Sequence, residues 1–263
     1  MKKLAIAALA FSVFAAPAFA ADLALKAPPP PAPVYDWTGG YVGLNLGGSW
    51  GRAASTITGT NGFSGAPFAI TSSSNTDGIV GGGQIGYNWQ FNNNWLFGLE
   101  ADIQGTGQRG TANLPPVSGT FGVIALFPYT STASLTEKLP WFGTARARLG
   151  VLATPNWLLY VTGGLAYGEI NTSGTVTTTT AAAGGTASVT SSASADTTKA
   201  GWTVGGGAEW KVASQWTVKL EYLYVDLGTV TNSFAGGGAF TTLGISTHVT
   251  DNIARIGLNY HFH

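Results

Sequence analysis

The sequence contains no cysteine and little charge: 12 basic and 12 acidic side chains make up 9% of its 263 residues. Without cysteine, disulfide frameworks, thiolate zinc sites and thiol nucleophiles are excluded. Soluble domains carry roughly 25% charged residues, so a water-facing surface of this composition would be poorly solvated. The balanced charge gives no basis for binding nucleic acid. In contrast, glycine (38 residues) and aromatic residues (12%) are abundant.

Long hydrophobic runs are also missing. Nowhere does the chain offer the ~18 uninterrupted apolar residues that a membrane-spanning helix needs. Its first apolar run, Leu4–Phe14, follows a basic start and precedes the small-residue site at 18–20, which is the layout of a bacterial signal peptide. We therefore predict a signal peptide over residues 1–20 and an exported protein. Residues 21–36, rich in proline, are predicted to be an extended periplasmic leader.

Residues 37–263 repeat one pattern, in which segments of alternating polar and apolar residues are joined by short turns and by long Gly/Ser/Thr-rich stretches. Short turns precede Trp95, Trp157 and Trp216 and indicate hairpins. The pattern predicts eight strands, near 40–50, 79–91, 95–106, 139–152, 157–170, 200–213, 216–227 and 249–262. The four long connections are predicted to be loops at 51–78, 107–138, 171–199 and 228–248.

Short turns at one end and long loops at the other are typical of outer-membrane barrels. Aromatic residues support this interpretation, because they gather at both ends of the apolar strand faces, as expected where rings meet lipid headgroups. The predicted fold class is therefore all-β, an eight-stranded antiparallel up-and-down transmembrane β-barrel. Its aromatic girdles are predicted to include Trp50, Trp89, Trp95, Trp141, Trp157, Trp202, Trp210, Trp216, Tyr260 and Phe262.

The opposite strand faces carry charge and are predicted to point into the lumen. They hold five acids and five bases: Glu100, Asp102, Glu209, Glu221, Asp251, Arg146, Arg148, Lys211, Lys219 and Arg255. An eight-stranded barrel is just wide enough for side chains to fill it, so these charges are predicted to pair as a plug that holds the barrel shut. The alternative is a narrow charged conduit for small solutes.

A catalytic alternative rests on Ser246 and His248, which lie at the outer end of the last strand with Asp251 nearby in sequence. A serine, a histidine and an orienting acid could form a lipid acyl hydrolase at the rim. Serine and threonine are abundant throughout these loops, so we predict that the protein is not an enzyme and has no catalytic residues.

Cofactor and metal sites are not predicted either. The stretch Gly81–Gly86 has the G-x-G-x-x-G spelling, but no helix follows it, so its glycines indicate close strand packing rather than dinucleotide binding. His261 and His263 are only two imidazoles, too few for a good metal site.

Three segments together carry a family resemblance: Trp37–Gly43, Gly81–Asn88 and Lys219–Gly228. They resemble the small outer-membrane barrels of alphaproteobacteria, the porin-like "outer membrane immunogenic protein" family, related in fold to the opacity and adhesion barrels. The resemblance implies a surface antigen in the envelope and no particular activity. Such chains usually end in an aromatic residue that the outer-membrane assembly machinery recognises; here Phe262 is penultimate.

The partners expected of such a protein are outer-membrane lipid, including lipopolysaccharide, and the assembly machinery, engaged through Phe262. The loops are expected to contact host or environmental surface ligands. By composition, loop 171–199 is predicted to be mobile. Loop 107–138 is more apolar and is predicted to be a packed cap over the mouth or an adhesive surface.

Overall fold

The computed structural model describes residues 36–61, 65, 67–92, 94–121, 127–182, 184–235 and 240–262. The predicted signal peptide, the predicted leader up to residue 35 and His263 lie outside the described residues. Among the residues that are described, no helix is long and apolar enough to cross a membrane.

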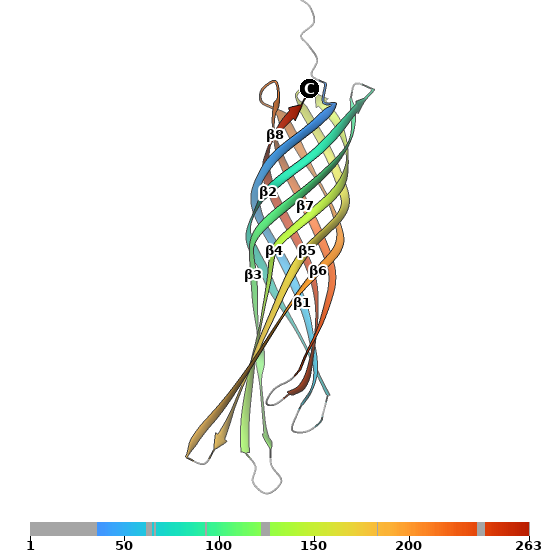
Figure 1. Ribbon diagram of the computed structural model, residues 1–263. Coiled ribbons are helices and arrows are strands. Elements are labelled where there is room, and N and C mark those ends of the chain that lie inside the picture. The colour runs from blue at the N-terminus through green and yellow to red at the C-terminus, as the bar shows by residue number, and fades with distance from the viewer. Residues whose placement is uncertain are drawn as a thin grey trace, which may run out of the picture. The chain divides into compact units, whose positions relative to one another are not determined.

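Eight strands make up the described chain (Figure 1). They are β1 (Gly39–Asn61), β2 (Pro67–Phe91), β3 (Trp95–Phe121), β4 (Phe127–Thr154), β5 (Trp157–Ala182), β6 (Gly185–Lys211), β7 (Trp216–Ala235) and β8 (Phe240–Phe262). Each strand pairs antiparallel with the next in chain order, and β8 pairs with β1, so the sheet closes into a barrel. The predicted fold class is confirmed.

The alternation of residue types shows which face of each strand points outward and which points into the barrel. Leucine, isoleucine and valine point outward over the middle of the barrel, where Leu44, Ile79 and Leu165 are 73%, 69% and 66% exposed. Their inward neighbours are buried, as Asn45, Val80 and similar residues show. An outward aliphatic band of this kind is stable only when hydrocarbon rather than water surrounds it.

Aromatic side chains border that band at both ends. At the short-turn end, the rings of Trp157 and Trp210 stack at 5.7 Å between their centres, and Trp216 contacts Tyr260 at 5.2 Å. At the other end, Trp202 contacts a tyrosine of β7 at 5.4 Å between ring centres. The predicted girdle residues all lie on the outer face, each half-buried or exposed: Trp50, Trp89, Trp95, Trp141, Trp157, Trp202, Trp210, Trp216, Tyr260 and Phe262.

The four ranges predicted to be loops are, for the most part, paired strand. Pairing between β5 and β6 continues to Ala182 and Gly185, so most of the range 171–199 is a ladder. Polar residues stabilise it: the hydroxyls of Thr177 and Thr190 lie 3.0 Å apart across the two strands. Threonine is a good strand former and pairs across strands through its hydroxyl, which the loop prediction overlooked.

The same correction applies to the other three predicted loops. The ladder between β1 and β2 reaches Thr60 and Pro67, within the predicted loop 51–78. Pairing of β3 with β4 fills most of 107–138, and pairing of β7 with β8 fills most of 228–248. Small polar residues occur on both faces of these strands, as Ser55 and Thr56 on β1 show, so their sequences lack the polar/apolar contrast by which the membrane strands were found.

Beyond the membrane band the closed sheet divides in two. The outermost pair between β2 and β3 is Asp77 with Arg109, and the outermost pair between β6 and β7 is Trp202 with Asp226. Further out, among the described residues, β3, β4, β5 and β6 pair as one sheet, and β7, β8, β1 and β2 as another. We call these paired ends the hairpin extension; Figure 1 shows them running past the barrel at the end opposite the C label.

Candidate functional site in the barrel lumen

Charged side chains fill the middle of the lumen. Glu100 and Asp102 on β3 face Arg146 and Arg148 on β4, because the alternation that sends leucine to the lipid sends charge inward. Small residues make room for them: a Cβ at Gly86 would overlap the phenol ring of Tyr41. The glycines of β2 therefore serve close side-chain packing inside a strand, as the sequence predicted, and not phosphate binding.

Glu100 is the hub of this lumen ion cluster and is only 4% exposed. Its carboxylate accepts hydrogen bonds from Lys219 Nζ at 2.8 and 2.9 Å, from Tyr41 Oη at 2.6 Å and from Arg146 Nη2. Arg148 Nη1 lies 3.8 Å from the same carboxylate. Arg255 Nη2 lies 3.7 Å from it as well. Four cations therefore share one acid, which only a network with further acids can balance.

The other acids supply that balance. Glu221 accepts from Arg255 Nε at 2.7 Å and from Arg146 Nη1 at 3.1 Å. Asp102 accepts from Arg255 Nη2 at 2.8 Å and from Arg146 Nη2 at 2.9 Å. Four acids and four bases thus interlock with direct ion pairs: Glu100, Asp102, Glu209, Glu221, Arg146, Arg148, Lys219 and Arg255.

Arg148 sits between two rings in this cluster. Its guanidinium carbon lies 4.7 Å from the ring centre of Tyr41 and 5.3 Å from that of Tyr160. Nη1 donates to Glu209 at 3.1 Å, and Nε and Nη2 donate to Asn88 at 2.9 and 2.7 Å. Planar stacking with several donors is the arrangement in which arginine tolerates burial.

An apolar layer closes the lumen on the short-turn side of the cluster. Trp37, Leu96, Leu158 and Tyr160 pack together, and the first three are fully buried. The Trp37 indole donates to the carbonyl of Pro155 at 3.2 Å, which fixes the ring in the mouth. The sequence analysis missed this plug because Trp37 precedes the first strand, where no alternation reveals its direction.

A second apolar layer lies on the other side. Inward residues of β2, β4, β5, β7 and β8 form it: Val80, Leu139, Phe142, Ala166, Ile170, Leu223, Val225, Leu227, Val230, Val249 and Ile253. The register shift between Lys138 and Trp141 lets Leu139 and Phe142 both face inward, although they are three positions apart on one strand. Such a shift interrupts the alternation of residue types, so this layer was not predicted.

Two of the ten predicted lumen charges lie outside the interlocked cluster. Asp251 is buried near the outer girdle, where Gln108 Nε2 donates to it. Lys211 is half-buried at the short-turn end of β6, opposite Thr217. The structure therefore brings eight of the ten together and places one at each end.

The residues of the rim hydrolase alternative do not converge. Ser246 and His248 point outward, whereas Asp251 points into the lumen, because an odd spacing along a strand puts side chains on opposite faces. The Ser246 hydroxyl lies 3.1 Å from that of Thr231. His248 has Asp226 at 3.5 Å as its acid neighbour. The hypothesis of a Ser246–His248–Asp251 relay is therefore wrong.

Glu137 is a buried carboxyl that the sequence analysis did not single out. It lies on β4 in the hairpin extension, four residues outside the girdle residue Trp141. Its Oε1 accepts from Thr247 at 2.8 Å and from Ser55 at 3.0 Å, and burial raises the pKa of the carboxyl. Among the described residues it has no ion-pair partner, and no group of three acidic, histidine or cysteine side chains there could hold a metal.

A closed eight-stranded barrel with a lipid-facing aliphatic band between aromatic girdles defines an integral outer-membrane β-barrel protein. The chain belongs to the family described as "Outer membrane protein beta-barrel domain", whose model matches residues 6–262. The predicted location in the outer membrane is confirmed, and so is the family resemblance.

Named relatives come from the alphaproteobacteria. The 31 kDa outer-membrane immunogenic protein of Brucella melitensis is 36% identical over the whole of both chains. The 25 kDa outer-membrane immunogenic protein of Brucella abortus is 27% identical over 100% of this chain and 99% of its own. Among solved structures, OprG from Pseudomonas aeruginosa covers 88% of this chain and 100% of its own, with 14% identity and a TM-score of 0.43.

Proposed function

We propose that the protein is a non-conducting barrel that supports the envelope and displays its hairpin extension as a surface antigen. One observation carries the proposal: a neutral, interlocked ion cluster lies between two apolar layers in the lumen. A hydrated ion crossing this path would lose its water at each layer, which costs several kcal/mol or more. The relatives named as immunogenic support the antigen role.

The alternative function is a small-solute porin. Buried polar atoms without a hydrogen-bond partner favour some water in the lumen: one oxygen of Asp102, the amide of Gln104 and Nη1 of Arg255. Such atoms usually bind single ordered waters. Because the apolar layers lie on both sides, we infer isolated waters rather than a continuous column.

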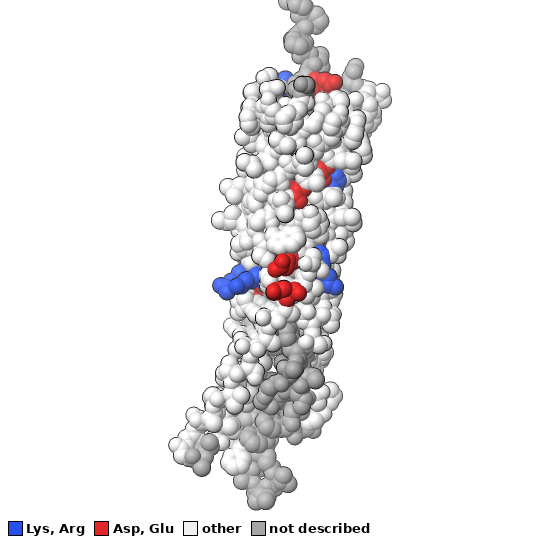
Figure 2. Space-filling model, in the orientation of Figure 1, with Lys and Arg blue, Asp and Glu red and all other residues white. Residues whose placement is uncertain are grey.

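Outer-leaflet lipid is the proposed partner of the barrel wall. Arg109 and Lys138 are direct cross-strand neighbours, both exposed, just outside the outer girdle. Like charges opposite each other repel, and a phosphate between them would relieve that repulsion. Figure 2 shows basic and acidic side chains gathered at one level of the surface, below a stretch of barrel with few charges. Phe262, 53% exposed beside Gly40, is the proposed contact for the assembly machinery.

Display is tested with an epitope tag on intact cells. A tag between Ala182 and Gly185, at the tip of the β5–β6 hairpin, should bind antibody without permeabilisation. The matched control carries the same tag between Ser214 and Gln215, in the turn joining β6 to β7, and should bind only after the outer membrane is opened. The reverse pattern would contradict the proposed orientation, and with it the display role.

A further inference from the structure

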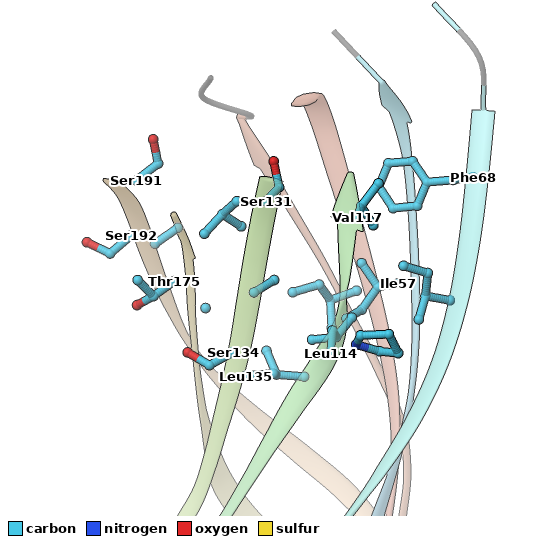
Figure 3. Close-up of a pocket in the computed structure, with 17 residues that line it drawn as sticks. Ile57, Phe68, Leu114, Val117, Ser131, Ser134, Leu135, Thr175, Ser191 and Ser192 are labelled. Carbon is cyan, nitrogen blue, oxygen red and sulfur yellow. The ribbon is translucent and has the colours of Figure 1, made fainter. Parts of the chain in front are cut away.

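The hairpin extension holds an apolar cavity of about 80 Å³ between its two sheets (Figure 3). We propose that this cavity binds a small uncharged apolar molecule. The site lies outside the membrane band and is separate from the lumen cluster.

Both sheets supply the wall. Ile57, Phe68, Ile70 and Ile245 come from β1, β2 and β8, and Leu114 and Leu135 come from β3 and β4, among seventeen lining residues. Four of these six side chains are less than 9% exposed, although the segment lies beyond the girdles in a region of polar sequence. Apolar side chains that converge around an unfilled space, in a segment otherwise bathed in water, indicate a ligand site.

The chemistry of the lining selects a neutral ligand. None of the seventeen lining residues is charged. Hydroxyls of Ser131, Ser134 and Thr175 contribute to the lining, and Figure 3 shows Thr175 on the side opposite Phe68 and Val117. An ion or a zwitterion would find no countercharge to offset its lost hydration. The volume of about 80 Å³ excludes a peptide.

An entry route lies at the seam between β2 and β3, where the strand pairing ends at Asp77 and Arg109. Cavity residues line both sides of this seam. On β3 the register shifts between Leu114 and Val117, and the two residues between them are Pro115 and Pro116. Proline has no N–H to donate, so this part of β3 is a poor partner for β2, and the seam stays open beside the cavity. Leu114, which is 8% exposed, points inward, and the register shift after it brings Val117 to the same side although the two are three positions apart.

The test is a toluene titration of the full-length mature protein refolded in lipid nanodiscs, followed by NMR of ¹³C-labelled isoleucine methyl groups. Ring-current shifts of Ile57, Ile70 and Ile245 should rise and saturate with toluene. Ile79 and Ile85 face the lipid and serve as internal controls. Their shifts should grow linearly, because they report partitioning of toluene into the bilayer.

Variants assign the saturable shift to the cavity. Ala133→Phe places a ring in the lining and should weaken toluene binding at least tenfold. Ala101→Phe, its matched control on the exposed lipid face, should leave binding unchanged. Heat-dependent gel mobility confirms that each variant is folded. If Ala133→Phe does not fold, Val117→Phe at the half-exposed edge of the cavity replaces it, with the same expected loss.

Three results would overturn the proposal. The first is a linear response at all five isoleucines, which would mean that toluene only partitions into lipid. The second is unchanged affinity in a folded cavity-filling variant. The third is a set of nuclear Overhauser contacts between the Ile57 or Ile245 methyl groups and lipid acyl chains before toluene is added, which would mean that lipid occupies the cavity.

Discussion

Glu100 is the single residue on which the lumen cluster depends most, since Lys219, Arg146 and Tyr41 all donate to it. Glu100→Gln keeps the shape but removes the charge, and so leaves buried cations without their shared acid. We expect the free energy of unfolding to fall by about 3–5 kcal/mol, as when one partner of a buried ion pair is removed. Urea titration in lipid vesicles, followed by tryptophan fluorescence, measures the change.

The matched control is Asp226→Asn. Asp226 also faces a basic side chain, but its partner His248 has 47% of its side chain exposed. Solvent-screened pairs contribute roughly 0–1 kcal/mol, so this change should be small. Equal effects of Glu100→Gln and Asp226→Asn would mean that the cluster is no more important than a surface pair.

From the buried carboxyl of Glu137 we predict that the stability of the hairpin extension depends on pH. Because the folded-state pKa of this carboxyl is raised, the folded hairpins bind the proton more tightly than the unfolded ones. Their local stability is fully present below 4.5, the ordinary value, and is lost as the pH rises through the raised pKa. Hydrogen exchange of the strands around Ser55 and Thr247, corrected for intrinsic rates, should show protection falling with pH.

In Glu137→Gln, which keeps an oxygen for the same hydroxyls, that protection should no longer depend on pH. Strands at the short-turn end of the barrel provide the reference, and their protection should be the same in both proteins. A pH dependence that survives in Glu137→Gln would assign the effect to another group.

At the scale of the strands, Pro115 and Pro116 of β3 are the feature that we expect to keep the two sheets of the extension apart. Replacing Pro115 and Pro116 together with Thr and Val restores two N–H groups and good strand formers. We expect β3 to pair further with β2, so that hydrogen exchange of residues 110–121 slows several-fold. Pro155→Thr, in the short turn between β4 and β5 at the other end of the barrel, is the control and should leave residues 110–121 unaffected. Unaltered exchange in the double variant would mean that the prolines do not hold the seam open.

The sequence predicted the strands of the membrane band well for a physical reason. Lipid outside and charge inside create a contrast at every second residue, and Leu99–Glu100–Ala101–Asp102 displays it plainly. The short turns before Trp95, Trp157 and Trp216 indicated hairpins and so gave the number of strands. The same contrast identified eight residues of the lumen cluster, although which acid meets which base depends on register and could not be read from one chain.

Other features lack that contrast and could not be predicted. Trp37 plugs the mouth from outside any strand, and a register shift puts Leu139 and Phe142 on the same, inward side of β4 although they are three positions apart. The strands of the extension carry serine and threonine on their inward as well as their outward faces, so their composition resembles that of a loop. Register shifts and side-chain packing come from the whole barrel rather than from any local pattern.

At the scale of the whole molecule, we propose that the lumen is a sealed structural core and that the surfaces available to other molecules lie on the hairpin extension. The apolar layers and the ion cluster together resemble the core of a soluble domain, enclosed here within a membrane barrel. Such a core fixes the eight long strands relative to one another. The rigid barrel in turn supports the paired hairpins that extend beyond the girdles.

The most direct test of this account is single-channel recording of the mature protein refolded into a planar bilayer, with folding checked by heat-dependent gel mobility. We predict silence from the folded barrel. Stable conductance steps would contradict the sealed lumen. The double variant Glu100→Arg/Arg146→Glu exchanges two charges of the cluster. If it altered the ion selectivity of those steps, the ions would be passing the cluster itself, and the account would be wrong.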